Sequence, residues 1–120
     1  MDWDSGTNIV SITVGGNHKG EDATELSKKF QEFVIDSTTA PFKILVNGSD
    51  SCKGDPESRR IHTEFIRKNF KKRPGAVALC SSSLFIKMIG KFVITVAPNA
   101  KLRIFDKVED GINWLKSLPN

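Results

Sequence analysis

The clearest feature of the chain is a set of short apolar runs separated by segments with a different periodicity. Residues 9–14 alternate between apolar and polar side chains, as a strand with one buried face does. Residues 42–46 and 76–80 are continuous apolar runs, which are typical of strands buried on both faces of a parallel sheet. Residues 102–105 form a further short run. We therefore expect a sheet organised around the strand at 42–46.

Four other segments have apolar residues at helical spacing. The predicted helices begin near Asp22, Pro56, Leu84 and Asp106. Asp22 and Asp106 each stand three residues before a glutamate, which is the spacing of a capping box. Residues 92–97 are rich in β-branched side chains and would also suit a strand, but we favour the helix.

The alternation of strands and helices indicates the fold class. From residue 42 onward each strand is followed by a helix, which favours right-handed crossovers and parallel pairing. Trp3 is expected in a first strand that reaches residues 9–14 through the turn formers at 4–8. We predict an α/β sandwich, a single domain over residues 1–120, with a mixed, mostly parallel sheet of about five strands, an N-terminal antiparallel hairpin and four helices.

Composition and charge narrow the function classes. The chain has 120 residues, of which 38% are hydrophobic and 27% charged, as in globular domains. The longest mostly apolar run, residues 84–97, is interrupted by two lysines and a glycine, so no transmembrane segment is expected. The N-terminus has no basic segment followed by an apolar one, so we expect a cytoplasmic protein. The net charge of +4 comes partly from the basic residues at 67–73, which complement a helix end, and no nucleic-acid partner is expected.

The cysteines and histidines show no sequence pattern typical of a metal or catalytic site. Cys52 and Cys80 lack C-x-x-C spacing and have no nearby ligands, so we expect free thiols, no metal and no cofactor. Cys52 with His62 could suggest a thiol nucleophile, but no oxyanion site is readable, and we expect no enzymatic activity. His18 and His62 are expected to be surface or boundary residues.

The candidate binding surface lies where two predicted strands end. The strand at 42–46 leads into a polar loop at 47–54, and the strand at 76–80 leads into three serines. Because the carboxyl ends of parallel strands meet at one edge of a sheet, both loops should lie there. Ordinary solvated connection and helix capping are the plainer roles for these loops. The candidate residues for binding a partner or an anion are Ser49, Asp50, Ser51, Cys52, Ser58, Ser81, Ser82 and Ser83.

The order of elements resembles the SpoIIAA-like branch of the STAS superfamily, named for sulphate transporters and anti-sigma factor antagonists. The likeness rests on residues 20–23, 42–46, 76–83, 91–94, 102–105 and 108–115, and it covers nearly the whole chain. It implies a STAS-like fold. In regulatory members a serine or threonine near the helix start after a central strand is phosphorylated, which switches partner binding off. Here the resemblance points to Ser49, Ser51 or Ser58, although Ser49-Asp50-Ser51-Cys52 replaces the usual Asp-Ser-Ser-Gly.

We therefore expect a non-enzymatic regulatory or protein-interaction module of the STAS-like type, with phosphorylation as a hypothetical switch. The expected partner is another protein, and a homodimer is left open. The alternative is a protein that binds a small ligand, either a lipid or a nucleotide. That alternative requires a cavity of roughly 300 Å³ or more.

Overall fold

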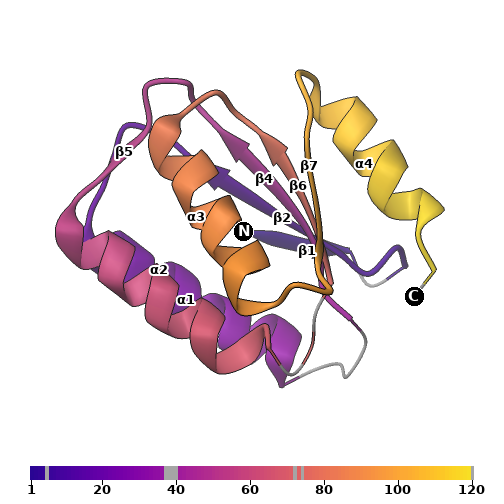
Figure 1. Ribbon diagram of the computed structural model, residues 1–120, viewed down its shortest axis with the longest axis horizontal. Coiled ribbons are helices and arrows are strands. Elements are labelled where there is room, and N and C mark those ends of the chain that lie inside the picture. Colours follow the sequence, from indigo (N-terminus) through magenta and orange to yellow (C-terminus); the bar gives the residue numbers. More distant parts are fainter. Residues whose placement is uncertain (5, 37–40, 72, 74, 120) are drawn as a thin grey trace.

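A computed structural model describes residues 1–4, 6–36, 41–71, 73 and 75–119 (Figure 1). Parts of the predicted hairpin turn (residue 5), of the loop before the central strand (37–40) and of a predicted helix end (72 and 74) lie outside the described residues. The strands are β1 (Asp2–Asp4), β2 (Ile9–Val14), β3 (Asn17–His18), β4 (Lys43–Gly48), β5 (Lys53–Gly54), β6 (Ala76–Cys80) and β7 (Lys101–Ile104). The helices are α1 (Gly20–Phe30), the π-helical continuation η1 (Gln31–Ile35), α2 (Pro56–Asn69), α3 (Leu84–Val96) and α4 (Val108–Ser117).

The main sheet has the strand order β1-β2-β4-β6-β7. β1 pairs with β2 antiparallel, and every other neighbouring pair in this sheet is parallel. The register places Ile44 of β4 between Val10 of β2 and Val77 of β6. Within the described residues, this arrangement confirms the predicted α/β class, with a five-stranded mixed sheet, an N-terminal antiparallel hairpin and four helices.

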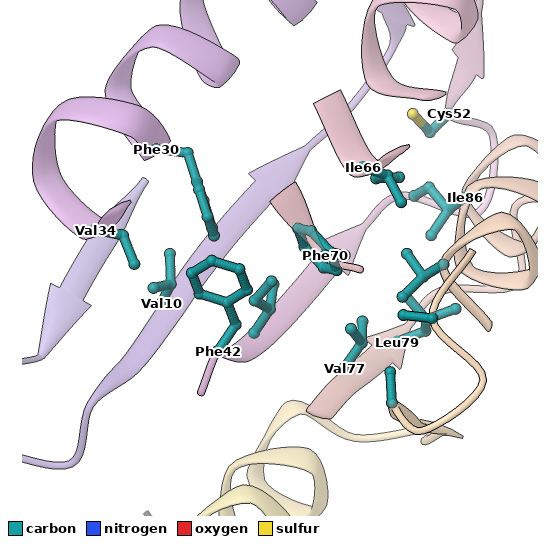
Figure 2. Packing of buried hydrophobic residues seen from close by; sticks show 14 residues of the cluster. Val10, Phe30, Val34, Phe42, Cys52, Ile66, Phe70, Val77, Leu79 and Ile86 are labelled. Atoms are coloured by element: carbon teal, nitrogen blue, oxygen red, sulfur yellow. The ribbon is translucent and has the colours of Figure 1, made fainter. Parts of the chain in front are cut away.

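Helices cover both faces of the sheet, with α1, α2 and α3 on one face and α4 on the other (Figure 1). The alternation along β6 explains the two cores, because successive side chains of a strand point to opposite faces. Val77 and Leu79 join the larger cluster, whereas Ala78 and Cys80 join the cluster under α4. Figure 2 shows Phe30, Phe42 and Phe70 of the larger cluster, which come from three different parts of the chain.

On the face of the sheet that α4 covers, the backbone of the helix lies close to the strands. A Cβ atom on Gly111 of α4 would lie 2.9 Å from Cδ1 of Leu45 and 3.1 Å from Sγ of Cys80. A glycine therefore lets the helix backbone reach the sheet, and Leu115 beside it is fully buried. At the other end of α4, the buried Lys43 donates a hydrogen bond from Nζ to the carbonyl oxygen of Leu118 at 2.7 Å.

A small second sheet, formed by β3 and β5, was not anticipated. These strands have two residues each and pair in parallel just beyond the ends of β2 and β4. The turn into β3 passes through Gly16, whose φ of +59° suits glycine. This pairing fixes the segment that carries His18 against the start of α2.

The capping roles expected of Asp22 and Asp106 are wrong, and one open choice is resolved. Helix α1 begins at Gly20 with Lys19 as its N-cap, and Asp22 lies in the first turn, where its Oδ2 accepts a hydrogen bond from the Lys19 backbone N–H at 2.9 Å. Helix α4 begins at Val108 after Lys107, so Asp106 is not its cap. Residues 92–96 belong to helix α3, as favoured, since their apolar side chains pack against the same core as the rest of that helix. No helix within the described residues has the length and apolar character needed to cross a membrane.

Candidate functional site

The loops that follow β4 and β6 form one surface, which we call the serine rim (residues 49–52 and 81–83). The backbone N–H of Ser82 donates to Oδ1 of Asp50 at 3.0 Å. The Ser81 hydroxyl donates to the carbonyl oxygen of Ser49 at 3.3 Å. The loops meet because β4 and β6 are adjacent and parallel, so their carboxyl ends lie at one edge.

Burial divides the three serines at the start of α3 into two kinds. Ser83 is 1% exposed, and its hydroxyl donates to the carbonyl oxygen of Cys52 at 2.7 Å and accepts from the Ile86 backbone N–H at 3.3 Å. Ser81 is also buried, and its Oγ accepts from the Ser83 backbone N–H. Ser82 is exposed. The hydroxyls of Ser81 and Ser83 therefore cap α3 and join the loops, and they are not open to a ligand.

The other loop presents its polar groups to solvent. Ser49, Asp50 and Ser51 are exposed. Hydrogen bonds from the backbone and side chain of Ser82 lower the pKa of the Asp50 carboxyl below its ordinary value. The rim thus exposes a charged carboxylate and hydroxyl groups to solvent. Contacts with residues 81–83 hold the backbone that carries these groups in place.

Ser58 stands apart from the rim. It is fully buried in the first turn of α2, where its hydroxyl donates to the Asp55 carbonyl oxygen at 2.8 Å. Its backbone N–H donates to Oδ1 of Asp55 at 2.7 Å. These bonds belong to the helix start and leave the side chain closed to solvent.

The two cysteines are free thiols in different cores. Cys52 is 3% exposed within the larger cluster, and Cys80 lies in the cluster under α4. Burial raises the pKa of both thiols. A buried thiol with a raised pKa is a poor nucleophile at neutral pH, because the thiolate is the reactive form.

Asp55 caps two helices at once. Its Oδ1 accepts from Ser58 in α2, and its Oδ2 accepts from the backbone N–H of Gly20 in α1 at 3.3 Å. These hydrogen bonds lower the pKa of the Asp55 carboxyl, the one from Ser58 most of all. The positive ends of both helices therefore face a carboxylate of the protein itself, in the position that an anion would otherwise take.

No pattern along the chain indicated the pairing between His18 and His62. The Nε2 atoms of the two rings lie 2.8 Å apart, across 44 positions in the chain. The ring planes are nearly parallel, at 10°, with centroids 5.0 Å apart. Since atoms of face-stacked rings cannot approach as closely as 2.8 Å, the rings meet edge to edge, and one Nε2–H donates to the other Nε2.

Both imidazoles are held in the neutral form. Burial lowers the pKa of His62 to about 4, and the charge of a protonated His18 would lower it further. Burial also lowers the pKa of His18, although the carboxylates of Asp22 and Asp55 oppose that effect. The expectation that both histidines are surface or boundary residues is wrong for His18, which is 8% exposed.

The histidine pair forms part of the wall of a cavity of about 120 Å³ that is partly open to the surface. Apolar side chains from β2, β4, β6 and the three helices on that face make up the rest of the wall, together with Ser27. Figure 2 shows Phe30, Ile66, Phe70, Leu79 and Ile86, all of which line this cavity. No charged side chain within the described residues lines it.

Comparisons with models of protein families, with curated proteins and with solved structures found no match to this chain. Within the part of the chain that the structure describes, no group of three or more His, Cys, Asp or Glu side chains could hold a metal ion. The candidate sites therefore rest on geometry alone, namely that of the serine rim and that of the cavity with its histidine pair.

Proposed function

We propose that this protein is a non-enzymatic interaction module that docks a protein partner on its serine rim. The observation that carries the proposal is the hydrogen bond from Ser82 to Asp50, which joins the two loops into one surface. Loops at the carboxyl ends of parallel strands are where α/β folds gather ligands and partners. A regulatory role is also what the resemblance to the STAS superfamily implies.

The exposed residues in and beside the rim are suited to contact with a protein partner. Leu84, the first residue of α3, is 84% exposed and follows the rim directly. Protein interfaces combine buried apolar anchors with a polar surround that supplies hydrogen bonds. Asp50 and Ser82 supply such a surround here, so we infer a partner with an apolar contact for Leu84 and a cationic or hydrogen-bond-donating group for Asp50.

The state of the reactive side chains favours a binding role over catalysis. The Cys52 thiol is buried with a raised pKa, and Nε2 of His62 is engaged by His18. A thiol nucleophile requires a base within hydrogen-bond reach and a thiolate that forms readily. The geometry of these three residues supports neither requirement.

We infer that Ser49 and Ser51 are the serines through which phosphorylation would regulate the rim. Both are exposed and flank Asp50, whereas Ser58 is fully buried. A phosphate adds about −1.5 to −2 charges at neutral pH, so it would repel Asp50 and weaken the contact with Ser82. Ser49→Ala and Ser51→Ala variants should each be compared with wild type for phosphate incorporation in a lysate of the native cell. Unchanged incorporation and unchanged partner affinity in both variants would remove this part of the proposal.

Site-specific photo-crosslinking tests the docking surface itself. A benzophenone side chain at position 84 should crosslink a distinct protein from the native lysate, and unlabelled wild-type protein should compete for it. An excess of unlabelled Leu84→Glu protein should not compete. The matched control places the same group at Ile104, which is 54% exposed on β7 and outside the rim.

The product of that crosslink decides between partners. A product at twice the mass of the chain identifies a second copy, whereas a heavier or lighter product identifies another protein. Identical products from positions 84 and 104, or no product from position 84 that wild type competes away, would contradict the rim as the docking surface.

The alternative of a lipid or nucleotide carrier has less support. The apolar cavity beside the histidine pair, at about 120 Å³, is well below the roughly 300 Å³ that a drug-sized ligand needs. A nucleotide phosphate would also have to displace Asp55 from the start of α1 or α2. A second pocket beside these helix starts has about 310 Å³ and contains Lys19 and Lys53, but the Asp55 carboxylate lines it as well and would repel a phosphate.

A further inference from the structure

We propose that the cavity between the sheet and helices α1 to α3 binds a compact, uncharged, single-ring molecule with one hydroxyl group, and that the His18–His62 pair receives that hydroxyl. This site is independent of the serine rim. The proposal rests on the volume of the cavity, the nature of its wall and the position of the two imidazoles.

The volume and wall define the size and polarity of the ligand. An apolar cavity of about 150 Å³ lined by aliphatic and aromatic side chains stays dry and binds benzene or xenon. This cavity has about 120 Å³ and is lined in the same way, which admits a single ring and excludes a lipid chain. Because no charged side chain within the described residues lines it, a carboxylate or phosphate would be buried without a partner, at high cost.

Water is a poor occupant of this space. A buried water typically makes about three hydrogen bonds to polar groups of the protein. Ser27, His18 and His62 are the polar residues in the described part of the wall, so a water bound to them would leave the apolar side chains of the wall without contacts. An apolar ring gains contact with the wall where water gains few hydrogen bonds.

The wall favours an aromatic ring in particular. The ring of Phe85 lies 6.0 Å from the His18 ring and 6.5 Å from the His62 ring, between centroids. Farther along the wall, Phe30 and Phe65 meet edge to face, with centroids 5.6 Å apart. Offset and edge-to-face contacts with such rings stabilise a further aromatic ring beyond its area of burial.

The histidine pair supplies the polar end of the site. One neutral imidazole donates at Nε2 and the other accepts there, so the pair offers one donor and one acceptor that now meet. A hydroxyl group also has one donor and accepts at its oxygen. If the two rings move apart from their 2.8 Å contact, the hydroxyl can lie between the Nε2 atoms with a hydrogen bond to each, whereas an apolar ring without a hydroxyl offers them no such partner.

The probes for the test are benzene and phenol, added at millimolar concentration to the full chain at pH 7.5. Methyl signals of Leu79, Ile86 and Val93, which line the cavity, should shift and saturate with both probes in ¹H–¹³C spectra. Phenol should bind about tenfold more tightly than benzene, because it replaces the histidine hydrogen bond with two others. His62→Phe should bind benzene and lose the preference for phenol.

Variants that fill the cavity provide the control. Ile89→Phe enlarges a half-buried lining residue and should abolish the binding of both probes, whereas Ile104→Phe makes the same change on exposed β7 and should leave binding unchanged. Val46→Ile is a milder filling variant that adds one methylene group and should weaken binding several-fold. The methyl spectrum of each variant without probe verifies that it is folded.

Three results would overturn the proposal. The first is the absence of saturable methyl shifts with either probe in the wild-type protein. The second is binding to Ile89→Phe or Val46→Ile as tight as to wild type. The third is equal affinity of wild type for benzene and phenol, which would leave the histidine pair without a role in recognition.

Discussion

His18 and His62 join two segments that are remote in sequence through a single Nε2 to Nε2 hydrogen bond of 2.8 Å. His18 belongs to β3, before α1, and His62 lies in the second turn of α2. The bond therefore connects the starts of two helices that pack on the same face of the sheet (Figure 1). It requires at least one neutral ring, which makes the stability of the fold sensitive to acid.

The first prediction concerns pH. An imidazole in the unfolded chain titrates near its ordinary pKa of 6.5, whereas the pKa of His62 in the folded protein is about 4. As the pH falls below 6.5, the unfolded chain takes up a proton that the folded protein does not, so the free energy of unfolding decreases until about pH 4. We expect a loss of roughly 2 to 3 kcal/mol over this window.

Denaturant unfolding at a series of pH values measures that loss. In the His62→Phe variant the free energy of unfolding should decrease clearly less between pH 6.5 and 4, because a phenyl ring that does not titrate replaces the imidazole. The pH dependence left in the variant reports His18 and the carboxylates. Superimposable pH profiles for the two proteins would show that the pair does not resist protonation.

The second prediction separates the buried serine from the exposed serine beside it. Ser83→Ala removes the cap of α3 and the bond to the Cys52 carbonyl oxygen, and it should lower the free energy of unfolding by roughly 1 to 3 kcal/mol. Ser82→Ala keeps the backbone N–H that binds Asp50, and it should change stability by about 0.5 kcal/mol or less. Chemical denaturation of both variants provides the measurement, and equal effects would contradict the structural role of Ser83.

The third prediction tests the contact that joins the rim. The Ser82 amide signal should titrate with Asp50, at a midpoint below the ordinary carboxyl pKa of 3.8, because the hydrogen bonds from Ser82 favour the ionised form. The stabilising effect of this contact is present above that pH and is lost as Asp50 protonates. Asp50→Ala should abolish the titration of the Ser82 amide, and Asp2→Asn, an exposed change on β1, should preserve it. A Ser82 signal that titrates in the same way without Asp50 would disprove the contact.

The fourth prediction compares two leucines at helix positions. Leu115 is fully buried between α4 and the sheet, so Leu115→Ala should cost about 2 to 5 kcal/mol through lost burial and the cavity left behind. Leu84 is 84% exposed, and Leu84→Ala should change stability by about 0.5 kcal/mol or less. Thermal unfolding of the two variants measures both effects. A small loss for Leu115→Ala would mean that α4 contributes little to the core.

The sequence-based predictions were accurate where a structural feature depends on residues that are close together in the chain. The apolar runs at 42–46 and 76–80 identified β4 and β6, because a strand buried on both faces has few polar positions. The start of α2 was predicted near Pro56 and lies there, because the capping roles of Asp55 and Pro56 depend on adjacent residues alone. For α1 the same kind of reading failed, since Asp22 could serve as the N-cap or, as it does, as the acidic residue in the first turn.

Patterns along the chain were enough to predict the class of fold and the edge of the sheet where two polar loops meet. Local periodicity and turn chemistry were sufficient for that, because they act within a few residues. The folded structure was needed to show that Ser58 and Ser83 are buried, that Ser82 faces solvent beside Asp50, and that His18 meets His62. Burial and the pairing of side chains from distant segments depend on how helices pack on the sheet, and no pattern along the chain specifies the distance between two such residues.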